Sequence, residues 1–259
     1  NSKLGASAER ALVMSRWTLD VLRSIYPKHI FKAIFGPKRA VRELKYRYTS
    51  TSKIRFPVDL LGIPKKNVSE WFDELAEEES FLTSVNESLE LRPPGPDRFY
   101  MTQEADLLYV LVRLMKPDVV VETGVGAGKS SAFILKAMQK NGKGVLHSID
   151  LPDEKQSSGW IVQDDLRSRW NLLLGTSEDI LDPLLQEVSP IDIFLHDSDH
   201  SYENMIFEFT SAWPALKSNG MLLAHDVGRN DSLFDFCRKI NYRWTKVRTF
   251  HVLAGLKKS

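Results

Sequence analysis

From residue 117 onward, short apolar runs alternate with helical stretches, and this alternation restricts the fold more than any other feature. The run "PDVVVETG" (117–124) is almost continuously apolar, as expected for a parallel strand that is covered on both faces. Further strands are expected at 144–150, 170–177, 191–199 and 220–227, helices at 129–144, 177–188, 202–220 and 231–240, and a closing hairpin within 243–258. This order predicts an α/β fold with a doubly wound, mostly parallel seven-stranded sheet.

The first hundred residues lack this strand rhythm. The stretches "AERALVMSRWTLDVLRSIY" (8–26) and "NVSEWFDELAEEESFLTSVNESL" (67–89) each predict a helix. The segment "RPPGPDR" (92–98) has three prolines and one glycine in seven residues, which is typical of a boundary. We therefore expect a mainly helical cap or substrate-binding region at 1–95 and the α/β domain at 96–259.

Charge is distributed unevenly along the chain. The net charge is +1, but residues 1–56 hold 13 Lys or Arg against 3 acidic residues. This basic arm either attracts an anionic acceptor, polymer or surface, or is the solvated face of a cap through which the chain could self-associate.

The bulk features exclude several classes of protein. No apolar run approaches the roughly 20 residues that span a bilayer, so no transmembrane segment is expected. The single cysteine, Cys237, rules out an internal disulfide and a multi-cysteine zinc site. We expect a cytoplasmic protein that does not act on nucleic acid.

The loop after the first strand, "ETGVGAGKSS" (122–131), combines two nucleotide-binding signatures and completes neither. A P-loop requires glycine where Thr123 stands, and a dinucleotide fold requires its third glycine where Lys129 stands. The carboxylate of Glu122 would repel a triphosphate but suits a ligand with positive charge, such as the amino group and sulfonium of S-adenosylmethionine (SAM). A tight turn without a ligand is the alternative.

Polar residues also follow the second and third strands. Ligands of open α/β sheets bind at the carboxyl ends of the strands. Asp150 ends the second strand and could accept hydrogen bonds from ribose hydroxyls. Ser177 and Glu178 follow the third strand, where they could meet an adenine edge, cap the next helix with Ser177, or do both. We expect Glu122 and Asp150 to lie at strand ends outside the core.

The fourth and fifth strands end in acids and imidazoles. Asp197, Asp199 and His200 follow the fourth strand, and His225 and Asp226 follow the fifth. Carboxylates edged by imidazoles form the kind of site that holds Mg²⁺, Mn²⁺ or Ca²⁺. A solvated turn at "DSDHS" (197–201) is the alternative.

Five segments in this order, "ETGVGAGKSS", "HSID", "GTSEDIL", "IDIFLHDSDHSYE" and "SNGMLLAHDV", resemble the motifs of class I SAM-dependent methyltransferases. Within that superfamily the sequence is most similar to the metal-assisted O-methyltransferases, both the catechol type and those that methylate sugar hydroxyls of natural products. The resemblance implies a Rossmann-like methyltransferase fold, and it does not extend to residues 1–99.

The resemblance implies that SAM lies over the first three strand ends. Glu122 would bind its amino group, the backbone at Thr123, Gly124, Gly126 and Gly128 would approach its methionine part, and Ser130 would bind its carboxylate. Asp150 matches the ribose acid, Ser177 and Glu178 match the adenine pair, and Asp197 would also border the cofactor.

The resemblance likewise implies a metal site and a base. Asp197 and Asp226 match the metal carboxylates, and His225 or Asp199 would complete the set around Mg²⁺, Mn²⁺ or a similar ion. His200 matches the general base that, with Asp197, would activate a hydroxyl of a sugar, phenol or natural product. A SAM-fold protein that binds without catalysis, and a NAD or nucleotide enzyme, remain as alternatives.

Overall fold

The computed structural model describes residues 45–91, 104–152 and 158–259. The chain divides into two units at residue 49, and nearly all described residues belong to the second unit, which begins at Thr49. The expected helix at 8–26, nearly all of the basic arm and the proline-rich segment at 92–98 lie outside the described residues. The predicted division between residues 95 and 96 falls in the same gap and stays a prediction. All seven strands of the sheet lie in the second unit.

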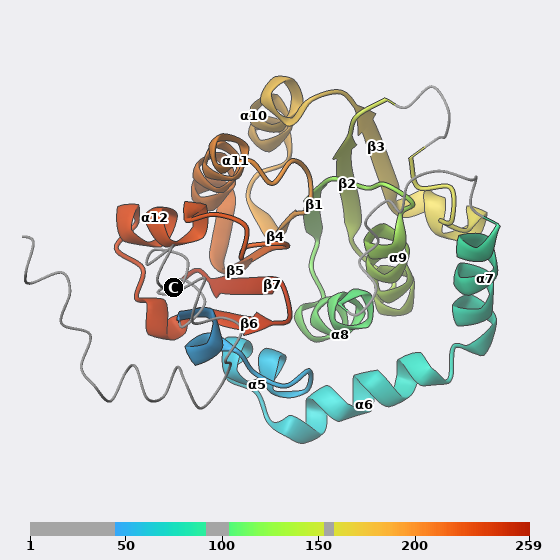
Figure 1. Ribbon diagram of the computed structural model, residues 1–259. Coiled ribbons are helices and arrows are strands. Elements are labelled where there is room, and N and C mark those ends of the chain that lie inside the picture. Colours follow the sequence, from blue (N-terminus) through green and yellow to red (C-terminus); the bar gives the residue numbers. More distant parts are fainter. Residues whose placement is uncertain (1–44, 92–103, 153–157) are drawn as a thin grey trace, which may run out of the picture. The chain divides into compact units, whose positions relative to one another are not determined.

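The second unit is built on a seven-stranded sheet, which confirms the predicted fold class (Figure 1). Its strands are β1 (Val119–Thr123), β2 (Val145–Asp150), β3 (Trp170–Leu174), β4 (Ile191–His196), β5 (Leu216–Ala224), β6 (Arg248–Phe250) and β7 (Leu253–Lys257). The order across the sheet is β3-β2-β1-β4-β5-β7-β6. The first five strands run parallel, and the predicted hairpin adds β6 and β7 antiparallel.

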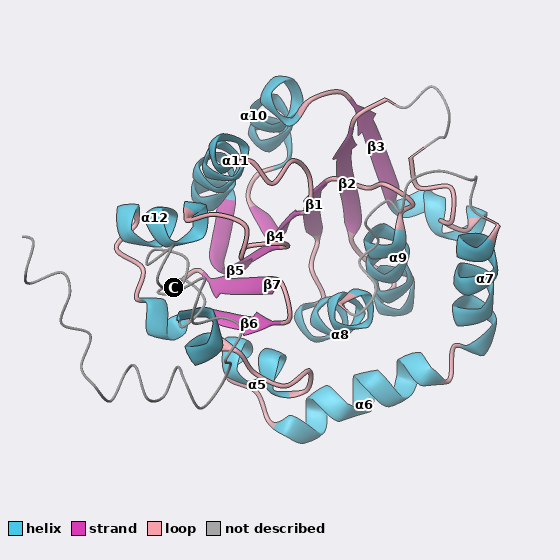
Figure 2. Cartoon of the chain, in the orientation of Figure 1, coloured by secondary structure: helices cyan, strands magenta, loops and turns pink. Residues whose placement is uncertain are grey.

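Helices cover both faces of the sheet (Figure 2). One face carries α8 (Ala105–Met115) and α9 (Lys129–Asn141), and the other carries α10 (Ser177–Val188), α11 (Tyr202–Ala215) and α12 (Ser232–Lys239). Two short 3₁₀ helices lie at η1 (Asp164–Arg169) and η2 (Trp244–Lys246). None of the helices in the described parts of the chain is long and apolar enough to cross a membrane.

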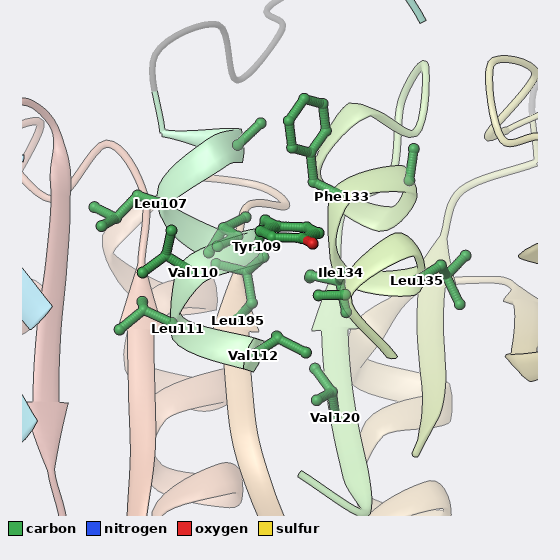
Figure 3. Packing of buried hydrophobic residues seen from close by; sticks show 14 of the residues in the cluster. Leu107, Tyr109, Val110, Leu111, Val112, Val120, Phe133, Ile134, Leu135 and Leu195 are labelled. Atoms are coloured by element: carbon green, nitrogen blue, oxygen red, sulfur yellow. The ribbon is translucent and has the colours of Figure 1, made fainter. Parts of the chain in front are cut away.

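No helix was predicted at α8, although its polar residues Asp106 and Arg113 fall at helical spacing. It is buried between the sheet and α6 and packs along α9. Tyr109 points from α8 toward α9 near Ile134, while Val120 and Leu195 face the two helices from β1 and β4 (Figure 3). All four side chains are fully buried, so this layer is the core that supports the ends of β1 and β4.

Between residue 55 and the gap at 92–103 lie the helices α5 (Arg55–Leu61), α6 (Lys65–Ala76) and α7 (Glu79–Glu90). The single helix predicted at 67–89 is therefore two helices. Glu78 leaves helical geometry between them, with ψ of 52°, and its carboxylate pairs with Lys136 at 2.9 Å and Lys140 at 2.5 Å on α9. These ion pairs fix the break against the neighbouring helix.

Candidate active site

The glycine loop after β1 places backbone against backbone. Gly124 has φ of +83°, and a Cβ there would lie 2.1 Å from the carbonyl oxygen of Asp197. Gly128 has φ of +93°, and its Cβ would lie 2.7 Å from Cα of Gly159. Gly126 has φ of +53° but faces open space. The outer two glycines are thus required for packing, and the middle one leaves room above the loop.

Glu122 lies below this loop and inside the core. The prediction that it lies outside the core is therefore wrong. Its side chain is fully buried and accepts hydrogen bonds from Ser130 at 2.5 Å, Ser131 at 2.6 Å and Ser148 at 2.7 Å. Burial raises the pKa of Glu122 to about 7, although the three hydroxyls oppose this change. The carboxylate therefore holds the start of α9 against β1 and β2, and the hydroxyl of Ser130 is committed to it.

Asp150 behaves as expected at the end of β2. It is partly exposed, and its carboxylate accepts the backbone N–H of Gly126 at 3.1 Å. The acid and the open side of the glycine loop are therefore in direct contact.

After β3, the residue that caps α10 is Thr176 rather than Ser177. The Thr176 hydroxyl accepts the N–H of Asp179 at 3.2 Å. Ser177 is the first helical residue, and its hydroxyl donates to the side-chain oxygen Oδ1 of Asn204 at 3.1 Å. Glu178 is exposed. Ser177 and Glu178, the predicted adenine pair, therefore lie at the edge of the sheet, and neither of them caps α10.

Asp197, His200 and His225 form a cluster where β4 and β5 end. One potential ligand atom from each lies within 4.8 Å of the others. Backbone hydrogen bonds hold the strand ends together. The N–H of Asp197 donates to the backbone carbonyl of Thr123 at 2.8 Å, and the N–H of His225 donates to the backbone carbonyl of His196 at 2.9 Å. Neighbouring strands thus bring together residues that lie 28 positions apart.

The closest contact in the cluster joins an imidazole nitrogen and a carboxylate oxygen. His225 Nδ1 lies 2.9 Å from Asp197 Oδ1, yet this nitrogen is buried and makes no aligned hydrogen bond. An imidazole nitrogen and a carboxylate oxygen that lie this close are ligand atoms that one divalent ion can hold. The cluster therefore fits a divalent ion. Burial lowers the pKa of His225, but the carboxylates of Asp197 and Asp226 outweigh burial and raise it.

The other two predicted metal ligands differ. Asp226 Oδ2 lies 3.6 Å from His200 Nε2, and the same carboxylate pairs with Arg229 at 2.5 Å. Asp199 turns away from the cluster, and its two oxygens accept the N–H of Ser201 at 3.1 Å and the Ser201 hydroxyl at 2.6 Å. Asp226 therefore borders the site, whereas Asp199 shapes the turn before α11.

Two residues behind His200 were not found from the sequence. His200 Nδ1 lies 3.3 Å from Nε2 of His196, and His196 Nδ1 lies 2.6 Å from Oε2 of Glu208 on α11. His196 and Glu208 are fully buried. The available signal was a lone glutamate within the apolar run "MIFEF" (205–209), which indicates a buried acid that needs partners.

Both Glu208 and His200 have pKa values below their ordinary values, for different reasons. Burial would raise the pKa of Glu208, but its hydrogen bonds, led by the one with His196, outweigh burial and hold it below its ordinary value. Burial lowers the pKa of His200, and the neighbouring His196 lowers it further. These environments favour an ionised Glu208 beside a neutral His200.

Known proteins resemble this chain in sequence and in fold. Residues 121–227 match the family model described as a methyltransferase domain. Two curated Mycobacterium proteins, both named "Putative O-methyltransferase", are similar in sequence. The protein of strain KMS is 29% identical over 138 residues, which are 49% of this chain and 60% of that protein. The protein of strain JLS is 35% identical over 96 residues, which are 36% of this chain and 42% of that protein.

Solved structures share the fold. The O-methyltransferase TomG from Streptomyces achromogenes, in complex with SAM, has a TM-score of 0.52 and 17% identity over 70% of this chain and 91% of that chain. The methyltransferase PaMTH1 from Podospora anserina, bound to S-adenosylhomocysteine (SAH), has a TM-score of 0.52 and 14% identity over 69% and 88% of the two chains. Residues 121–227 thus match a methyltransferase domain in sequence, and the chain shares the fold of these two methyltransferases.

Proposed function

We propose that this protein transfers a methyl group from SAM to a hydroxyl oxygen of a small molecule. The observation that carries the proposal is the contact between two halves of one site. The glycine loop packs through Gly124 onto the backbone of Asp197, which belongs to the cluster of acid and imidazoles. A cofactor over the loop would therefore present its reactive end to a group that can accept a proton.

On the cofactor side, we assign the methionine part of SAM to the open backbone around Gly126 and the ribose hydroxyls to Asp150. Ser177 and Glu178 would border the adenine. Glu122 and Ser130, which bond each other, would support the loop from below rather than contact SAM directly. This assignment changes the roles that the resemblance implied for Glu122 and Ser130, neither of which would contact SAM.

On the acceptor side, the donor set suits a divalent ion. Asp197 and His225 of the cluster would hold it, together with Asp226, which borders the cluster through His200. The mixture of carboxylate oxygen and imidazole nitrogen suits Mn²⁺, Fe²⁺ or Zn²⁺ at least as well as Mg²⁺. Such an ion, when bound, lowers the pKa of a hydroxyl that it contacts.

His200 is the proposed general base. Its Nε2 lies 3.8 Å from Asp197 and 3.6 Å from Asp226, so this nitrogen faces the same space as the two carboxylates. The acceptor oxygen forms a bond to the methyl carbon while the carbon–sulfur pair returns to sulfur, which yields SAH. The hydroxyl proton passes to His200 Nε2. Holding the reactants in line contributes roughly 7–11 kcal/mol.

Cofactor binding tests the first half of the proposal. Calorimetric titration with SAH should show binding that Asp150→Asn weakens by about tenfold, because each neutral ribose contact to a carboxylate adds about 1.5–3 kcal/mol. Asp164→Asn is the matched control, since Asp164 is a fully exposed acid of η1. Binding of NAD or ATP in place of SAH would overturn the assignment.

Turnover tests the second half. Methyl-labelled SAM incubated with catechols, hydroxylated sugars and their phosphorylated forms should give labelled product, and a preference for the phosphorylated sugars would support an anionic acceptor. SAH binding without transfer to any hydroxyl compound would favour a binding protein of the same fold. The cytoplasmic location, and self-association through the cap, stay predictions.

A further inference from the structure

A buried chain of polar groups runs from α11 to the proposed base, and the function proposed above does not use it. His200 contacts His196 through Nδ1 at 3.3 Å, and His196 contacts Glu208 at 2.6 Å. His196 and Glu208 have no exposed surface. Buried polar groups of this kind are retained only when each has a defined partner, so the direction of every hydrogen bond is fixed by its neighbours.

The surroundings of Glu208 consist of donors alone. Oε2 accepts the Thr123 hydroxyl at 2.6 Å, and Oε1 accepts the Ser198 hydroxyl at 2.6 Å and the side-chain amide of Asn204 at 3.2 Å. An ionised carboxylate can only accept hydrogen bonds. The fourth contact, from His196 Nδ1 to Oε2, must therefore be a donation by the imidazole.

This donation determines the protons of both imidazoles. A neutral imidazole has one donor and one acceptor nitrogen. Because Nδ1 of His196 carries its proton toward Glu208, Nε2 of His196 is an acceptor. The contact between the two rings then requires that Nδ1 of His200 donate. The proton of His200 lies on Nδ1, and its Nε2 is bare and faces Asp197 and Asp226.

We propose that Glu208 is a positioning residue, which acts through His196 to hold His200 in the tautomer whose bare Nε2 faces the acceptor site. The inference rests on the proposed role of His200 as the base. A base that carries its proton on Nε2 cannot take another one there, so the wrong tautomer is inactive whatever the acceptor is.

Nitrogen-15 NMR tests this directly and requires no acceptor. In protein labelled at the imidazole nitrogens and held at alkaline pH, long-range proton–nitrogen spectra distinguish protonated from bare ring nitrogens. Single His→Gln substitutions assign the signals. We expect His196 and His200 of the unchanged protein each to carry the proton on Nδ1. A proton on Nε2 of His200, or a His196 ring that is protonated on both nitrogens, would overturn the proposal.

Glu208→Gln should reverse both tautomers. The side-chain amide of Asn204 is held as a donor by the carbonyl of Asp199 at 2.8 Å, so the new glutamine must turn its oxygen toward Asn204. Its amide nitrogen then faces His196 and donates to Nδ1. His196 becomes protonated on Nε2, donates to His200, and leaves the His200 proton on Nε2. Unchanged signals at both rings in this variant would contradict the proposal.

Two further variants separate positioning from general damage. Glu208→Asp keeps an acceptor-only carboxylate and should keep both protons on Nδ1. Glu74→Gln also removes a partly buried carboxylate, one that accepts from Arg113 at 2.7 Å, and should leave the histidine signals unchanged. If Glu208→Gln does not fold, the unchanged protein and Glu208→Asp still decide the question. SAH binding is measured separately, so failure of the tautomer assignment and failure of the methyltransferase proposal are distinguishable.

Discussion

Two buried glutamates lie on opposite faces of the sheet beneath the site, and their charges are stabilised differently. Glu122 faces α9 and is surrounded by three serine hydroxyls, whereas Glu208 on α11 is bonded by Thr123, the next residue of β1, and by His196. Successive residues of a strand point to opposite faces, which explains how β1 serves both.

The pKa values of the two acids shift in opposite directions. The pKa of Glu122 rises to about 7, and that of Glu208 is held below its ordinary value. The three hydroxyl donors of Glu122 offset only part of the effect of burial, while Glu208 accepts from an imidazole N–H as well as from hydroxyls. The cofactor region therefore depends on shape and neutral contacts, and the acceptor region depends on charge.

The largest effect should come from the position where the two regions touch. In Gly124→Ala the new methyl group would meet the carbonyl of Asp197 at 2.1 Å, in a backbone conformation that alanine disfavours. We expect a loss of about 3 kcal/mol or more in the free energy of unfolding. Gly126→Ala shares the positive φ but faces open space, and should cost about 1–2 kcal/mol. Denaturant unfolding of both variants measures the difference, and equal losses would show that the contact is not required.

The second effect tests the two glutamates by pH. Glu122 has an ordinary pKa of 4.5 and a folded pKa of about 7, so its contribution to stability is complete below pH 4.5 and is lost as pH rises toward 7. The loss is at most about 3 kcal/mol. Glu122→Gln cannot titrate at this position. As pH rises from 5 to 7, the free energy of unfolding should therefore fall more in the unchanged protein than in the variant.

Glu208 should show the opposite sign. Its pKa is lowered in the fold, so its contribution is present above pH 4.5 and is lost as pH falls through the folded value. The difference in unfolding free energy between the unchanged protein and Glu208→Gln should therefore shrink on acidification. Parallel curves for the Glu122 and Glu208 variants would remove the distinction drawn between the two regions.

Much of the fold could be predicted from the sequence. Apolar runs that end in polar residues marked the five parallel strands, because parallel strands are buried on both faces and ligands bind at their ends. The helix α8 was missed although its polar residues Asp106 and Arg113 lie at helical spacing. The break at Glu78 could not be predicted, because it depends on lysines of α9 that are distant in sequence.

The site was predictable only in its outer part. Asp197, His200 and His225 were expected together because adjacent strand ends must meet, and the structure brings them together. Asp199 looked equivalent to Asp197, but a local turn with Ser201 uses its carboxylate. Glu208 was missed because its partners come from β1, from the end of β4 and from the first turn of α11, and residue type alone does not specify them.

A third, smaller effect concerns the acceptor region. Asp197→Asn should weaken Mn²⁺ binding by at least about tenfold, or about 1.4 kcal/mol, because it removes the oxygen beside the buried nitrogen of His225. Asp199→Asn changes the same residue type two positions later and should leave Mn²⁺ affinity unchanged. Calorimetric titration of Mn²⁺ compares them. Equal losses would return Asp199 to the ligand set, and no binding in any form would leave His200 as the only activating group.

The smallest effect returns to the cofactor region, where a hydroxyl can serve the fold or the ligand. Thr176 caps α10, and Thr176→Ala should lower the free energy of unfolding by about 1 kcal/mol, or the melting temperature by about 2–4 °C. Ser177→Ala removes the hydroxyl next to it, which takes no part in the cap, and should change stability less while weakening SAH binding if that hydroxyl meets the adenine. Thermal unfolding and SAH titration of the two variants should therefore give opposite rankings. If Ser177→Ala left SAH affinity unchanged, the contact with Asn204 would be the whole function of that hydroxyl, and the adenine would be recognised by the backbone of the strand end alone.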